Sequence, residues 1–300
     1  MRALIFILFF TFDTAIFAQM TSATPTETPE IGFSIIKTSK VSVQEWLLKP
    51  DGSLFKKIDS NFSAFLIKHH QDYLLFDTGL GRHIEEQYQQ DMPLWQWPFF
   101  KFDQPVISAR AQLDATGFSP IKNVIISHSH WDHAGGVLDF PEAQIYTSAE
   151  ELEVIRHPTT GAGGTWASQI ASKAIRWRAI VFNNGPYKGY EKSLDLYHDG
   201  SIILVPMAGH TTGSIGMFLT TDNGSCYFFI GDVAWTVDAL KASATKFWAA
   251  GLIVDHDAKE TLASVNQVRV LLEKYPETII VPAHDSTIQN ELGYFPRWMR

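Results

Sequence analysis

Four side chains that bind metal ions well crowd into six positions of the stretch IISHSHWDHAGG, residues 125–136. They are His128, His130, Asp132 and His133. His130 follows His128 by two positions, and in an extended segment this spacing places both side chains on one face. Burying so many polar groups without a bound ion would be very costly. Imidazole and carboxylate donors suit Zn²⁺, with Fe or Mn as alternatives, so the stretch predicts a metal site without cysteine ligands.

Strand-like runs are the elements that must position these residues. Four such runs stop at a candidate ligand: NVIIS at His128, ILVPMAG at His210, YFFIG at Asp232 and TIIVPA at His284. Strands are rigid and the loops at their ends carry function, so four strand ends that deliver His or Asp predict one shared site. The glycines at 135–136 allow the tight backbone path that the first loop needs.

Helical patterns lie between these runs, at residues 105–116, 148–156 and 257–275. The last has an apolar stripe at three- and four-residue steps, made of Leu262, Val265, Val268 and Leu272. Strands and helices mix without strict βαβ alternation. Two sheets between layers of helices would accommodate this order.

The chain resembles the metallo-β-lactamase-fold hydrolases. The resemblance rests on HSHWDH at 128–133, AGHTTGS around His210, FIGDV around Asp232 and VPAHD around His284, preceded by LLFDTGLG, and it covers about residues 60–290. It implies an α/β fold, a four-layer αββα sandwich with the metals at one edge.

The resemblance also implies a role for each ligand. One metal would be held by His128, His130 and His210, the second by Asp132, His133 and His284, and Asp232 would bridge both. Asp77 of the FDTG turn resembles a carboxylate that orients a ligand histidine, although an ordinary turn aspartate is the alternative. Of the other histidines, none lies in a matching motif, and His256 in the polar VDHD is the nearest to one.

Two adjacent zinc ions would turn a bridging water into a hydroxide near neutral pH, so hydrolysis is the expected reaction, with Asp132 and Asp232 as its catalytic carboxylates. The substrate predicted first is an N-acyl-homoserine lactone or related lactone. A phosphotriester or aryl ester comes second and a β-lactam third. A non-catalytic metal-binding module is a different class, but all seven ligand positions are filled.

Aromatic residues offer a substrate wall. The segment MPLWQWPFFKF, residues 92–102, predicts an apolar lid that includes Trp97 and Phe100, with internal packing or a homodimer contact as alternatives. Trp235 follows Asp232 by three residues and is a third predicted substrate contact. Acyl-homoserine lactonases carry a tyrosine at a comparable spacing, whereas an indole N–H donates one hydrogen bond and cannot act as an acid.

Composition limits the remaining choices. The 300 residues carry a formal net charge of −8, which disfavours a nucleic-acid partner and leaves a small-molecule substrate. Residues 1–18 resemble a signal peptide and 19–30 a leader rich in Thr and Pro, which leaves one hydrolase domain at 31–300. We therefore expect a periplasmic or secreted protein with no stable membrane anchor after cleavage.

Overall fold

Two β-sheets form the centre of the computed structural model, which describes residues 28–49, 51–118 and 120–300. The six-stranded sheet has the order β1 (Ile31–Gln44), β2 (Lys57–His69), β3 (Asp72–Phe76), β4 (Asn123–Ile125), β5 (Gln144–Ser148) and β6 (Arg176–Ile180). The five-stranded sheet has the order β11 (Ile279–Val281), β10 (Cys226–Phe229), β9 (Ile215–Thr220), β8 (Ile202–Pro206) and β7 (Leu194–Asp195).

The main core lies between the two sheets. Phe33 on β1 and Phe65 on β2 meet Phe229 on β10, with ring centroids 5.1 and 4.9 Å apart in edge-to-face geometry. Leu204 and Met217 from the second sheet join the same fully buried cluster. Each sheet has apolar residues on both faces, so each needs a second cover on its outer side.

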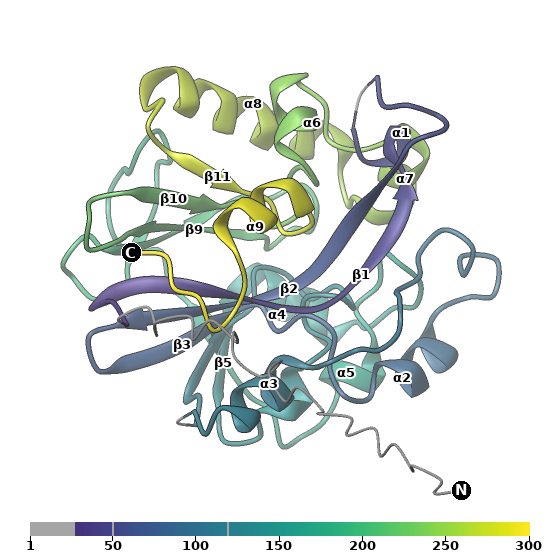
Figure 1. The fold of residues 1–300 in the computed structure, drawn as a ribbon, viewed down its shortest axis with the longest axis horizontal. Coiled ribbons are helices and arrows are strands. Elements are labelled where there is room, and N and C mark those ends of the chain that lie inside the picture. The colour runs from purple at the N-terminus through teal and green to yellow at the C-terminus, as the bar shows by residue number, and fades with distance from the viewer. Residues whose placement is uncertain (1–27, 50, 119) are drawn as a thin grey trace, which may run out of the picture.

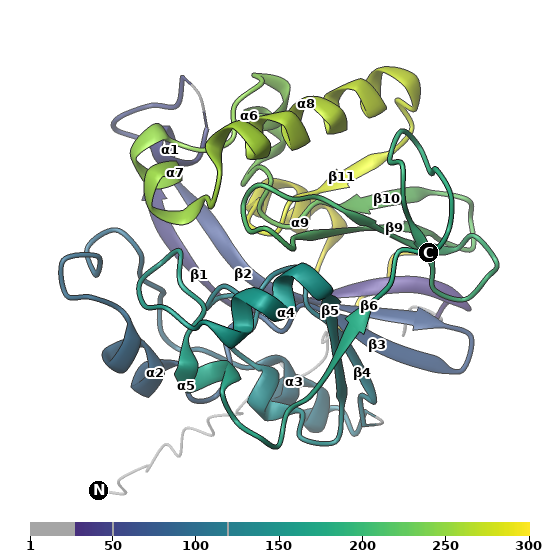
Figure 2. The ribbon, with the colours of Figure 1, turned by 180° about the vertical axis from the view of Figure 1, so that it is seen from behind.

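Helices provide that cover. One set packs on the outer face of the six-stranded sheet: α2 (Ile84–Asp91), α3 (Ala109–Ala115), α4 (Ala149–Arg156), α5 (Ala167–Ile170) and the 3₁₀ turn η1 (Val137–Asp139). Another lies beside the five-stranded sheet: α6 (Val237–Lys241) and α8 (Ala258–Lys274). Between them in the chain, α7 (Trp248–Val254) lies near the end of β1 instead. Figures 1 and 2 show the resulting helix–sheet–sheet–helix order, with α1 (Glu45–Leu48) and α9 (Ser286–Leu292) at its margins. The predicted four-layer αββα sandwich is confirmed.

The three predicted helices are present as α3, α4 and α8, and the four strand-like runs that end at candidate ligands are present as β4, β8, β10 and β11. The predicted stripe on α8 is wrong by part of a turn, because the buried apolar residues are Val265, Val268 and Leu271, whereas Leu262 is 39% exposed. The long strand β1 was not predicted. Its interior polar residues, such as Ser34, interrupt the apolar run, and pairing with β2 creates it.

The predicted signal peptide, residues 1–18, lies outside the described residues, as does the predicted leader apart from residues 28–30. Within the described ranges, no helix is long and apolar enough to cross a membrane.

Candidate metal centre

The loop after β4 brings the first ligands together. The backbone turns sharply here, since the N–H groups of His133 and Ala134 both donate to the carbonyl of His130. A Cβ at Gly135 would lie 2.7 Å from the carbonyl oxygen of Trp131, so only glycine fits this predicted turn. The loop is further fixed by Ser129, whose N–H and hydroxyl donate to the buried carboxylate of Glu151.

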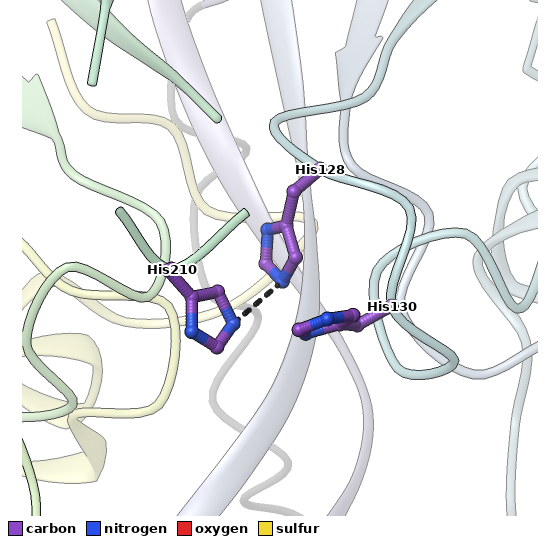
Figure 3. A group of neighbouring side chains, drawn as sticks. All are labelled: His128, His130 and His210. Carbon is purple, nitrogen blue, oxygen red and sulfur yellow. Dashed lines mark hydrogen bonds between the residues drawn. The ribbon is translucent and has the colours of Figure 1, made fainter. Parts of the chain in front are cut away.

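His128, His130 and His210 form one group of converging imidazoles (Figure 3). One nitrogen from each lies within 4.8 Å of the others, and Nε2 of His128 is 3.2 Å from Nε2 of His210. The rings cross at 81–84°, with centroids 4.5–4.7 Å apart. Such rings direct lone pairs to a common point, which is the arrangement that a bound cation needs.

A second group lies directly beside the first. Nε2 of His284 is 3.3 Å from Asp132 Oδ2 and 3.1 Å from Asp232 Oδ1. Asp232 also approaches Nε2 of His133 at 3.2 Å and Nε2 of His210 at 3.6 Å, so its carboxylate lies between the two groups. The structure thus brings all seven predicted ligands together in the arrangement that the resemblance implied. Their binding of metal stays a prediction.

The residues present fit two zinc ions. Nε2 of His133 and Oδ1 of Asp232 are buried and have no hydrogen-bond partner, although they are only 3.2 Å apart. Orphaned buried polar atoms are costly, and a cation between them would satisfy both. Neutral imidazoles with carboxylates are a donor set that Zn²⁺ accepts.

Burial and neighbouring charges shift the pKa values of these groups in different directions. Burial lowers the pKa of His128 and of His130 well below 6.5, so both imidazoles are neutral at pH 7. Burial would raise the pKa of Asp232, but the imidazoles of His284 and His133 hold it well below 3.8. His128 and His130 are therefore neutral nitrogen donors beside an ionised Asp232. Burial would lower the pKa of His133 and of His284, but the neighbouring carboxylates, above all Asp77 for His133 and Asp232 for His284, raise both.

Asp77 orients the ligand His133. Its Oδ2 is 2.8 Å from His133 Nδ1, and Ser127 donates to the same carboxylate through its N–H and its hydroxyl. With Nδ1 engaged, Nε2 of His133 is left to face the centre. Asp77 adopts a φ of 58°, a left-handed conformation that aspartate tolerates. These contacts support the role that the resemblance implied, a carboxylate that orients a ligand histidine, rather than that of an ordinary turn aspartate.

A second carboxylate with this task was missed from sequence. Asp255 Oδ1 is 2.7 Å from His210 Nδ1 and also accepts from Lys246 Nζ at 2.8 Å. Lys246 has no exposed side-chain surface and donates a further bond of 2.6 Å to the carbonyl of Asp232. The polar VDHD was the available signal, but its histidine, His256, is exposed and lies outside the centre.

Two more ligand imidazoles are held through their Nδ1 atoms. Nδ1 of His284 is 2.7 Å from the carbonyl oxygen of Asn61 on β2, and Nδ1 of His128 is 3.0 Å from the hydroxyl of Ser127. Backbone and hydroxyl partners carry no recognisable sequence signal. These contacts make the centre rigid before any ion binds.

An apolar pocket opens onto the two groups. It encloses about 240 Å³. Its polar floor consists of His130, Asp132, His210, Asp232 and His284, and its walls include Phe62, Trp95, Phe99, Phe100, Trp235 and Phe247. A small polar floor under aromatic walls is typical of a site for a small molecule with a polar head and an apolar remainder.

Two of the three predicted substrate contacts line this pocket. Phe100 is part of its wall, and Trp235 lines it while donating its indole N–H to Asp232 Oδ2 at 2.8 Å. Trp97 is not a lining residue, which corrects the prediction. Its ring packs 5.4 Å from that of Tyr88 and its N–H donates to the carbonyl of Met92. Within 92–102 the residues that reach the pocket are instead Trp95, Phe99, Phe100 and Lys101.

This fold and centre define a class, and comparison with known proteins agrees. The chain belongs to the metallo-beta-lactamase superfamily, whose family model matches residues 61–284. It is a hydrolase of that superfamily.

One curated relative is the N-acyl homoserine lactonase AttM of Rhizobium radiobacter, 29% identical over 192 residues, which are 63% of this chain and 67% of AttM. A solved N-acyl homoserine lactone hydrolase with N-hexanoyl-L-homoserine at its catalytic metal centre superposes with a TM-score of 0.69 at 16% identity, covering 91% of this chain and 100% of the other. AidC, a dizinc quorum-quenching lactonase, superposes with a TM-score of 0.53 at 18% identity, covering 86% and 89%. At identities of 16% and 18%, these superpositions show that the fold is shared and nothing further.

Proposed function

We propose that this protein is an N-acyl-homoserine lactonase that works with two zinc ions outside the cytoplasm. The observation that carries the proposal is the junction of seven converging His and Asp side chains with an aromatic pocket. The lactone ring and its amide link carry polar oxygens, whereas the hydrocarbon tail of the acyl group has none, so the two ends of this substrate match the floor and the walls. The activity of the relative AttM supports the same choice.

Two zinc ions held by these ligands would polarise the carbonyl group of the substrate and would make a water molecule nucleophilic at neutral pH. Asp132 and Trp235 supply the remaining functions of the site. Asp132 lies on the pocket floor, where it can orient the attacking water and pass a proton to the ring oxygen as the ester bond breaks. Trp235 fixes the carboxylate of Asp232, so its indole is a positioning group here and offers the substrate mainly its ring.

Export and assembly complete the proposal. The signal-like residues 1–18 support a periplasmic or secreted enzyme.

Trp95 and Phe99, which line the pocket, are 62% and 63% exposed. Such exposed apolar rings favour the segment 92–102 as the contact surface of a homodimer.

The test is hydrolysis of N-acyl-homoserine lactones by zinc-loaded protein, followed by release of one proton per ester opened. Each buried methylene contributes about 0.8 kcal/mol, so kcat/KM is expected to rise roughly fourfold per CH₂ until the chain outgrows the pocket. Asp232→Ala should lose turnover, and Asp114→Ala, which removes an exposed carboxylate on α3, is the matched control.

Protein shown to hold two zinc ions that leaves every acyl length intact would refute the lactonase. Turnover of a phosphotriester or a β-lactam by the same preparation would then identify the substrate class. A cleaved N-terminus on protein recovered from the periplasm or medium tests export separately.

A further inference from the structure

A second cluster of metal-ligating side chains lies at the end of the sandwich opposite the candidate metal centre. His69 ends β2 and His70 follows in the turn to β3, on the left of Figure 1, whereas Asp199 lies between β7 and β8. One ligand atom from each lies within 4.8 Å of the others. Because β2 and β8 belong to different sheets, this cluster joins the two sheets.

The side chains are already held in place. The ring of His69 stacks on Tyr197 at 3.6 Å and 11°, and its Nε2 is 2.7 Å from Asp199 Oδ2. The other oxygen of Asp199 accepts from the N–H and hydroxyl of Ser201 at 2.9 and 2.6 Å. The carboxylate therefore cannot turn away from His69.

His70 is placed by an unusual backbone. Its φ is 51°, a left-handed conformation in which glycine or asparagine would cost less, and its N–H donates to the carbonyl of Glu30 at 2.7 Å. The result is that its ring lies 4.6 Å from that of His69 and its Nδ1 lies 3.3 Å from Glu30 Oε2. Glu30 thus brings a second carboxylate to the cluster.

The charges around the cluster favour a cation. Asp199 and Glu30 supply two negative charges, and Asp72 on β3 is the register partner of His69. Partial burial would raise the pKa of Asp199, but hydrogen bonds from Ser201 and His69 lower it to about 2. The facing positive group is Lys68, whose Nζ is 3.8 Å from Glu30 Oε1. Negative charge remains in excess after this pair.

We propose that His69, His70 and Asp199 form a separate zinc site with Glu30 as the fourth ligand. Two imidazoles and two carboxylates are a donor set that Zn²⁺ accepts. Ligand atoms around a tetrahedral zinc lie about 3.3 Å apart, so the side chains need only small rotations. The ion would tie the start of β1 and the β2–β3 turn to the second sheet, which makes its role structural.

The test counts zinc in protein whose catalytic centre is already loaded. Equilibrium dialysis at micromolar free zinc should show one equivalent more in the wild type than in His70→Ala or Asp199→Asn. His157→Ala, which removes an exposed imidazole on the surface near α4, is the matched control and should keep the extra equivalent. At free zinc near 100 times Kd, the Tm of the wild type should rise by roughly 5 °C relative to His70→Ala.

Equal zinc counts in the wild type and in both variants would overturn the proposal. So would extra binding that appears only at millimolar zinc, where exposed histidine pairs bind metal without a built site. Lactonase activity does not enter the readout, so the outcome is independent of the proposed function. Unchanged turnover in His70→Ala would show that the catalytic centre is intact.

Discussion

Lys246 offers the sharpest test of how the centre is held together. Replacing it with methionine keeps the aliphatic stem but removes the cation that pairs with Asp255 and donates to the carbonyl of Asp232. Asp255 Oδ2 already has no hydrogen-bond partner, so in Lys246→Met this buried carboxylate keeps only the bond from His210. Removing one partner of a buried ion pair costs about 3–5 kcal/mol. Because methionine fills the space, we expect a loss near the lower end, about 3 kcal/mol.

A double variant separates charge from packing. Lys246→Met/Asp255→Asn has no buried charge at this place, yet an amide oxygen still faces His210 Nδ1. Its expected loss is about 1 kcal/mol, the net worth of an ordinary hydrogen bond, so the second change should restore stability. Lys241→Met on α6 is the surface control and should stay within about 0.5 kcal/mol of the wild type.

Urea unfolding at fixed free zinc, repeated with the metal chelated, measures these free energies. The same preparations should show a zinc affinity reduced 10–100-fold in Lys246→Met, because Asp255 is no longer held by Lys246 and orients His210 less firmly. A single variant as stable as the wild type would refute the argument from an uncompensated charge. A double variant that is less stable than Lys246→Met would also refute this argument, because the loss of stability would then come from packing and not from an uncompensated charge.

Three further predictions concern other contacts. Asp77→Asn keeps a residue that tolerates the left-handed backbone but weakens the hold on His133, so zinc affinity measured by chelator competition should fall 10–100-fold. Trp235→Phe removes the N–H that fixes Asp232, and kcat should fall roughly tenfold at unchanged zinc content, whereas an unchanged kcat would exclude a positioning role. The pKa of Asp199 in the fold is about 2 against 3.8, so its stabilising contribution is present above about pH 4 and lost as pH falls through 2. The stability difference between wild type and Asp199→Asn, from urea midpoints at several pH values, should shrink over that window.

The chemistry of the centre was predictable from sequence because its ligands are marked locally. Three imidazoles and a carboxylate within six positions have few other uses, and His210, Asp232 and His284 each follow an apolar run. Strand ends in a sandwich meet at one edge, so the order of these motifs along the chain was enough to predict a common site.

The walls of the pocket were less predictable. The aromatic segment 92–102 was recognised, but which of its rings face the pocket depends on the path of an irregular backbone. Trp97 turns inward to Tyr88, and Phe99 lines the pocket instead. A segment without period 2 or 3.6 gives no rule for the direction of a side chain.

The sequence by itself determined the donor set, the layered α/β fold and the hydrolase class. Only the tertiary structure decided what holds and surrounds the donors: the carbonyl of Asn61 behind His284, Lys246 behind Asp255, and the walls of the pocket. The physical reason is the separation along the chain of the residues that determine each property. Ligand identity resides in the type of a side chain and its near neighbours, whereas orientation and burial come from contacts such as that between Asn61 and His284, which are 223 residues apart in the chain.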